Sequence, residues 1–184
     1  VTGKKVQFFA VQSNSAEVEA MRSGRLHIAG FSTGPTPFAV NLAGVEPFAI
    51  MGSEDGQFGY KLQVYTQADS DIKAGDYDAA PVASEVVDRM AERGLYDPAE
   101  VRIVWESDPF PTTSYGVAHD LTPELKDKIK EAFFSYDFTG TALGEEFSGV
   151  SKFVPITYKD QWAVIRQIQS ANGVEYTPQG LAAE

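Results

Sequence analysis

Apolar residues recur along the chain with two different periods, which together predict an α/β protein. Runs with a period of two are typical of strands, and a period near 3.6 is typical of helices. The predicted strands are residues 5–11, 26–30, 45–51, 60–65, 77–80, 101–105, 114–119 and 152–156. The predicted helices are residues 16–23, 37–42, 81–93, 141–147 and 159–171, with one more beginning at Pro123. Because strands and helices alternate at the start of the chain, we predict a parallel sheet with helical crossovers.

Three segments depart from this regular order. Residues 68–73 begin like a capped helix, yet Gly75 and the short strand 77–80 follow at once. Residues 107–113 are rich in proline and are predicted to be extended, as a connection between two lobes would be. The residues after Tyr176 are predicted to form a loose tail.

The segment 30–38, Gly-Phe-Ser-Thr-Gly-Pro-Thr-Pro-Phe, joins a predicted strand to a predicted helix. Thr36 suits the N-cap of this helix, and Pro37 suits its first helical position. A helix start leaves backbone N–H groups unpaired and carries the positive end of the macrodipole. The segment also holds three hydroxyl groups, those of Ser32, Thr33 and Thr36. The turn therefore suits a small oxyanion, although an ordinary capped turn has the same pattern.

Charge and composition restrict the partners. The 184 residues carry a net charge of −11, which argues against nucleic acid or an anionic membrane because both attract Lys and Arg. A small anion is not excluded, since N–H groups and hydroxyls can bind it. The absence of Cys removes thiol catalysis, disulfides and thiolate metal sites. Neither a glycine-rich phosphate loop nor a metal-ligand spacing of His occurs, and no cofactor or metal is expected.

Several stretches resemble the phosphate/phosphite/phosphonate family of periplasmic solute-binding proteins of ABC transporters. They lie in the family's order and spread over most of the chain. The stretches are residues 28–35, 59–60 with 68–72, 75–83, 103–111, and 155–158 with Trp162. None of them is diagnostic alone, but their combination is fairly specific.

The resemblance implies a two-lobed α/β clamshell, the type II periplasmic-binding-protein fold, that closes on a small phosphorus oxyanion. Residues 1–66 with 108–184 would form the first lobe, and 67–107 would be a remnant of the second. Family members usually carry another strand and helix before residue 5, and about sixty residues where Lys73 here meets Ala74. We therefore expect the chain to lack the N-terminal strand and helix and part of the second lobe.

The resemblance also implies site residues. The family's aromatic after the second strand corresponds to Phe31, its Gly-Tyr aromatic to Tyr60, and its ligand-contacting Asp to Asp78. A carboxylate can accept hydrogen bonds from P–OH groups and would reject ligands that have no proton to donate. Beside these three, the candidate ligand-binding residues are the turn hydroxyls Ser32, Thr33 and Thr36 and the weaker candidates Thr112 and Thr113. The alternatives are core packing for Tyr60, an exposed strand end for Asp78 and an extended hinge for Thr112 and Thr113.

The sequence therefore predicts the binding component of an ABC transporter for phosphonate, phosphite or a related oxyanion. Its partner would be the membrane permease, and the protein would be a periplasmic monomer, soluble or lipid-anchored. A sensor that reports an oxyanion to a membrane receptor is the alternative. An enzyme of the same fold is a third hypothesis, but no acid–base pair supports it.

Overall fold

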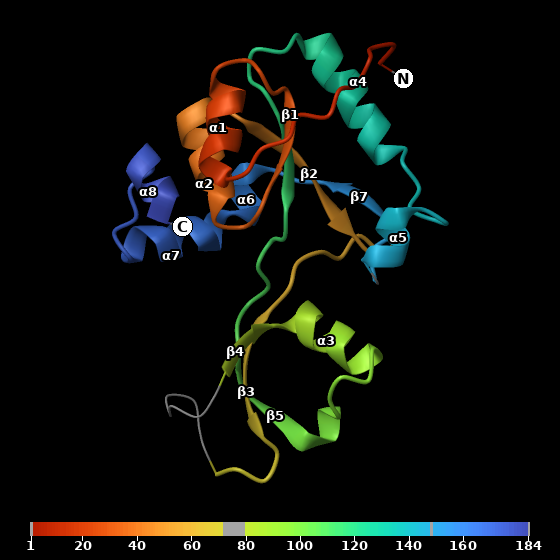
Figure 1. The fold of residues 1–184 in the computed structure, drawn as a ribbon, viewed down its shortest axis with the longest axis vertical. Helices are drawn as coiled ribbons and strands as arrows, with labels where there is room; N and C mark the ends of the chain where they lie inside the picture. The colour runs from red at the N-terminus through yellow and green to blue at the C-terminus, as the bar shows by residue number, and fades with distance from the viewer. Residues whose placement is uncertain (1, 72–79, 148, 184) are drawn as a thin grey trace. The chain divides into compact units, whose positions relative to one another are not determined.

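The computed structural model describes residues 2–71, 80–147 and 149–183. These residues form two compact units, shown in Figure 1: unit 1 is Val1–Phe58 with Pro111–Glu184, and unit 2 is Gly59–Phe110. The predicted junction between Lys73 and Ala74 lies outside the described residues. The predicted lobe limits, at 66 and 108, stay a prediction, because the units are defined by the contacts of this chain alone.

Unit 1 is built on a four-stranded sheet with the strand order β1-β6-β2-β7. The strands are β1 (Ile28–Phe31), β2 (Glu46–Gly52), β6 (Ser114–Val117) and β7 (Lys152–Pro155). Every neighbouring pair is antiparallel, so the predicted parallel pairing is wrong. β1 and β2 do run in the same direction, but β6 arrives from much later in the chain and pairs with both of them.

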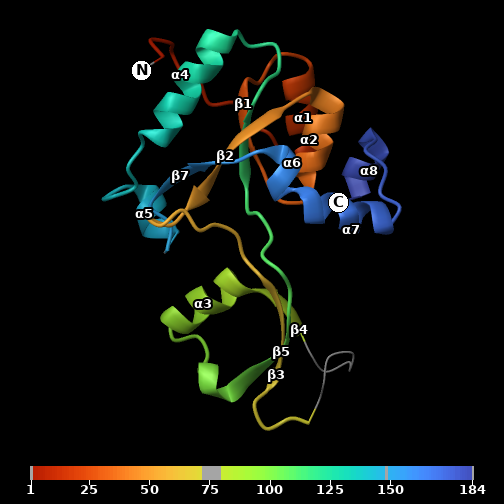
Figure 2. The same cartoon turned by 180° about the vertical axis from the view of Figure 1, so that it is seen from behind.

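Helices cover both faces of this sheet (Figures 1 and 2). On one face lie α1 (Asn14–Arg22), α2 (Pro35–Ala43) and the C-terminal α8 (Pro178–Ala183), and on the other lie α4 (Pro123–Phe134) and α5 (Ala142–Glu146). Two apolar clusters fill the spaces between helices and sheet. Val117, the last residue of β6, packs in the cluster on the α4 side of the sheet, and the next residue, Ala118, packs in the cluster on the α1 side. This alternation follows from the pleat, which points successive side chains to opposite faces.

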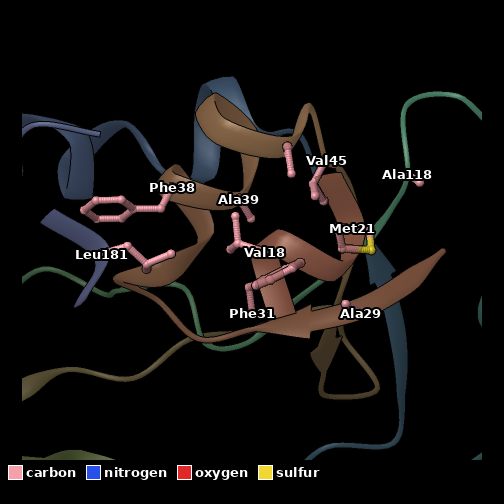
Figure 3. Close-up of a cluster of buried hydrophobic side chains, with 10 residues drawn as sticks. Val18, Met21, Ala29, Phe31, Phe38, Ala39, Val45, Ala118 and Leu181 are labelled. Carbon is pink, nitrogen blue, oxygen red and sulfur yellow. The ribbon is translucent and has the colours of Figure 1, made fainter. Parts of the chain in front are cut away.

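The α1–α2 cluster holds β1 against its helices. Figure 3 shows Phe31 among the side chains of Val18 and Met21 from α1 and Phe38 from α2, and these four are at most 3% exposed. Leu181 of α8 joins the same cluster at 4% exposure. The residues after Tyr176 therefore end in a docked helix, and the predicted loose tail is wrong.

Residues 5–11 do not form the predicted strand. Val6 and Phe8 are 84% and 89% exposed, and a cavity of about 730 Å³ is lined by this segment, by residues 25–28 and by α4. A strand is stable only when its backbone groups find partners. The alternating sequence is present, but β1 pairs with β6 and no described strand pairs with residues 5–11.

The predicted last helix is two helices, α6 (Tyr158–Gln161) and α7 (Ala163–Ala171), which meet at Trp162. The hydrophobic period of the sequence continues through Trp162, so the pattern does not predict the break between α6 and α7. The indole of Trp162 is fully buried, and its N–H makes a hydrogen bond that places this residue in the site described below.

Unit 2 is a three-stranded antiparallel sheet with one helix against it. The strand order is β4-β3-β5, formed by β4 (Ala80–Ala83), β3 (Leu62–Gln67) and β5 (Val101–Glu106). The helix α3 (Ser84–Glu92) follows β4, and a short 3-10 helix, Pro98–Glu100, precedes β5. The predicted helix 81–93 began too early, because its first residues pair with β3 instead.

Candidate functional site

The turn between β1 and α2 is the candidate site in unit 1. The helix begins at Pro35, with Gly34 as its N-cap, and no side chain caps it. The prediction of Thr36 as N-cap and Pro37 as first helical residue is therefore wrong. No acidic residue lies in the first turn, so the positive end of the helix is not neutralised by its own side chains.

Thr36 turns its hydroxyl back toward the end of β1 instead. Its Oγ1 lies 3.1 Å from the carbonyl oxygen of Phe31, 2.8 Å from that of Ser32 and 2.9 Å from Ser114 Oγ. Thr36 and Ser114 are both fully buried. The hydroxyl thus fastens the turn to β6.

Two side chains from the C-terminal helices reach the same turn. Trp162 Nε1 donates a hydrogen bond to the carbonyl oxygen of Thr33, at 2.9 Å. Gln169 Nε2 of α7 donates to the carbonyl oxygen of Gly34, at 3.2 Å. Sequence reasoning named Trp162 only together with the stretch 155–158 that resembles the family. The available signal was that a buried indole N–H needs an acceptor, although the sequence does not say which one.

The segment 111–113 lies beside the turn. Thr33 Oγ1 donates to the carbonyl oxygen of Pro111 at 2.6 Å, and a Cβ at Gly30 would lie 3.3 Å from Thr113 Cγ2. The structure therefore brings Thr33 together with Thr112 and Thr113, the two candidates from the proline-rich connection. Ser32 is exposed, and Thr33, Thr112 and Thr113 are half-buried.

The aromatic residues near the turn differ in exposure. Phe31 is fully buried in the α1–α2 cluster, so it packs in the core and does not present its ring at the surface. Tyr115 of β6 lies against Gly30, with Cε1 3.3 Å from the position of an added Cβ. Burial raises the pKa of the Tyr115 phenol.

The two remaining candidates belong to the other part of the chain. Tyr60 lies in unit 2, where its backbone exchanges both hydrogen bonds with Phe110, at 3.0 and 2.7 Å, and its ring packs 6.0 Å from the Phe110 ring. This pairing joins the two ends of unit 2. Asp78 lies outside the described residues. The assignment of all eight candidate residues to ligand binding stays a prediction.

Neither a metal site nor a membrane span is seen in the described part of the chain. Within residues 2–71, 80–147 and 149–183, no group of three or more His, Asp or Glu side chains is placed to hold a metal ion. Within the same ranges, no helix is long and apolar enough to cross a bilayer.

Several solved structures have a fold similar to that of this chain. The binding-protein component of an ABC phosphonate transporter from Pseudomonas aeruginosa matches with a TM-score of 0.64 and 18% identity, over 96% of this chain and 79% of that one. PhnD1 from Prochlorococcus marinus, in complex with methylphosphonate, matches with a TM-score of 0.67 and 10% identity, over 92% and 86%. A protein from Xanthomonas citri bound to chloride ion matches with a TM-score of 0.61 and 14% identity, over 86% and 84%. These likenesses confirm the predicted fold class, an α/β type II periplasmic-binding-protein fold.

A family profile, described as ABC transporter, phosphonate, periplasmic substrate-binding protein, matches residues 1–75 and 72–162. The chain belongs to this family, and the predicted resemblance is confirmed. The two matched ranges overlap at residues 72–75. The sequence predicts a missing segment at the same place. The family is a class of periplasmic solute-binding transport proteins and not a class of enzymes.

Proposed function

We propose that this protein binds phosphonate, phosphite or a related phosphorus oxyanion and delivers it to the permease of an ABC transporter. Membership of the phosphonate-binding family carries this proposal. Further support comes from PhnD1, whose similar structure is a complex with methylphosphonate. The comparisons offer no support for the alternative of a sensor.

The turn between β1 and α2 supplies chemistry that fits such a ligand. Its N-terminal helix end carries a partial positive charge with no acidic residue in its own first turn, and Ser32, an exposed residue, precedes it. An acidic protein can bind an anion in this way because peptide dipoles, and not net charge, provide the attraction.

Ligand choice is proposed to depend on Asp78 and on closure of two lobes. A carboxylate that contacts the ligand accepts a hydrogen bond from a P–OH group. An oxyanion without a proton cannot donate to this carboxylate and is repelled by its negative charge. Closure would follow because the ligand favours the state in which both lobes contact it.

Calorimetric titration of the full chain with methylphosphonate, phosphite, phosphate and sulfate tests the proposal. We expect heat of binding with the phosphorus compounds at neutral pH and none with sulfate, which carries no proton there. In the Asp78→Asn variant, the amide can donate to a fully ionised oxyanion, so discrimination against sulfate should fall. Absence of binding with all three phosphorus compounds would contradict the proposed function.

A further inference from the structure

The carbonyl groups of the turn all face donors inside unit 1. Thr36 Oγ1 lies within hydrogen-bond distance of the first two carbonyl oxygens, those of residues 31 and 32. Trp162 Nε1 binds the third, that of Thr33, and Gln169 Nε2 binds the fourth, that of Gly34. Four consecutive carbonyls are thus held by side chains that come from α2, from the α6–α7 junction and from α7.

Peptide geometry fixes where the N–H groups of the turn point. In a trans peptide unit the C=O of one residue and the N–H of the next point in opposite directions. With the carbonyls of residues 31–33 directed inward, the N–H groups of residues 32–34 are directed away from Thr36 and Trp162. The bond from Trp162 to the carbonyl of Thr33 therefore sets the direction of the Gly34 N–H.

Gln169 is itself held in one orientation. The side chain is 6% exposed, and Tyr176 donates its hydroxyl to Gln169 Oε1 at 3.2 Å, so the amide nitrogen is the atom turned to Gly34. The Tyr176 ring lies edge-on to Phe38 of α2, with centroids 5.2 Å apart and the planes at 89°. A chain of contacts thus runs from α2 through Tyr176 and Gln169 back to the N-cap of the same helix.

We propose that Trp162 and Gln169 are positioning residues for the phosphorus oxyanion. Trp162 sets the direction of the Gly34 N–H, and Gln169 holds the carbonyl of Gly34, whose peptide unit with Pro35 has no N–H of its own. The inference rests on the proposed function and assigns to both side chains a role that neither could perform by direct contact, since both are buried. N–H donors that are fixed before binding bind an anion more tightly than mobile ones, because less order must be gained.

The test compares Trp162→Phe with Trp105→Phe in the full chain. The first variant removes the N–H but keeps an aromatic ring, and the second makes the same change at a residue of β5 that is 45% exposed. Titration with methylphosphonate should give a Kd about tenfold higher for Trp162→Phe than for the parent. This corresponds to a loss of about 1.4 kcal/mol of binding free energy, which is typical for the loss of one hydrogen bond. Trp105→Phe should bind like the parent protein.

A second comparison uses Gln169→Glu with Gln167→Glu as control, since Gln167 is exposed on the same helix. The ionised carboxylate cannot donate to the carbonyl of Gly34, so Gln169→Glu should bind at least about tenfold more weakly at neutral pH. A protonated carboxyl group can donate again. The affinity of Gln169→Glu should therefore approach that of the parent protein as the pH falls. A purely structural defect would not produce this pH dependence.

The Gly34 amide provides a readout that needs no ligand. Its ¹H–¹⁵N signal and hydrogen-exchange rate in the free protein should change in Trp162→Phe and stay unchanged in Trp105→Phe. If Trp162→Phe and Gln169→Glu bind methylphosphonate like the parent, or if the Gly34 amide is unchanged, the positioning role is wrong while the proposed function stands. If the parent protein binds no phosphorus oxyanion, the proposed function fails and the inference fails with it.

Discussion

Thr36 Oγ1 and Ser114 Oγ lie 2.9 Å apart with no exposure to solvent, and this pair fastens the first helix turn of α2 to β6. Both residues come from segments separated by a long stretch of the chain. A buried hydroxyl that loses its partner costs more free energy than the hydrogen bond itself contributes.

Thr36→Val should therefore lower the free energy of unfolding by about 1–3 kcal/mol, because it leaves Ser114 Oγ without its hydroxyl partner and removes the hydroxyl that contacts the carbonyl oxygens of residues 31 and 32. Urea denaturation measures the change. Thr36→Ser keeps the hydroxyl and should recover most of the loss, while equal stability of the Val variant and the parent would show that the pair contributes nothing.

Gly59 and Gly56 offer a matched pair of glycine substitutions. Both have positive φ, +99° and +82°, where a side chain costs about 1–2 kcal/mol. An added Cβ at Gly59 would lie 2.4 Å from the carbonyl oxygen of Phe110, whereas nothing lies within 4 Å at Gly56. Gly59→Ala should thus destabilise by about 1–3 kcal/mol more than Gly56→Ala in thermal unfolding. Equal effects would contradict the close approach of Gly59 to Phe110.

Phe8→Ser tests whether residues 5–11 form a strand in solution. With Phe8 89% exposed, we expect the stability to change by no more than about 0.5 kcal/mol. The control, Phe138→Ser, removes a ring that is 1% exposed and should cost at least about 3–5 kcal/mol. A large loss with Phe8→Ser would mean that the segment is paired and buried after all.

Leu181→Ala tests whether α8 is docked. Leu181 is 4% exposed in the α1–α2 cluster, so its truncation should lower the free energy of unfolding by about 2–5 kcal/mol. Leu95→Ala, at a residue 66% exposed, makes the same change at the surface and should have little effect. If the two variants melt alike, the C-terminal residues form the loose tail that the sequence predicted.

Glu106 makes the stability of unit 2 depend on pH. Hydrogen bonds from Lys61 Nζ and from Gln63 Nε2, the latter at 2.6 Å, lower the pKa of its carboxyl group. Its contribution to stability is present above the ordinary glutamate pKa and is lost as the pH falls through the lowered value. The difference in melting temperature between the parent and Glu106→Gln should shrink over that range. Carboxyl NMR that shows Glu106 titrating at or above the ordinary value would contradict the assignment.

Local signals in the sequence predicted most elements of unit 1 and the turn itself. Gly44 ends α2 in the left-handed conformation, as a glycine behind an apolar run predicts, and Thr122 caps α4 through its hydroxyl. These features depend on a few neighbouring residues. The same holds for Ser32 and Thr33, whose position at the end of β1 follows from the strand that precedes them.

What the sequence could not predict depends on residues distant along the chain. The position of β6 between β1 and β2 depends on which strand edges are free, and the direction of the Thr36 hydroxyl depends on Ser114. Trp162 reaches the turn because α6 and α7 break there, although the apolar period continues. Such contacts are fixed by tertiary packing, and a single sequence carries no local signal for them.

The place of β6 in the sheet has a consequence for folding. The strand that joins β1 to β2 follows the whole of Gly59–Phe110 in the sequence, so the central pairing of unit 1 forms only when the chain closes a loop of at least that length. Until then β1 and β2 expose unpaired edges and apolar faces, which are prone to aggregate. Contacts between residues so distant in sequence also make folding slow. The folding chain therefore passes through a stage that is prone to aggregation before β6 pairs with β1 and β2.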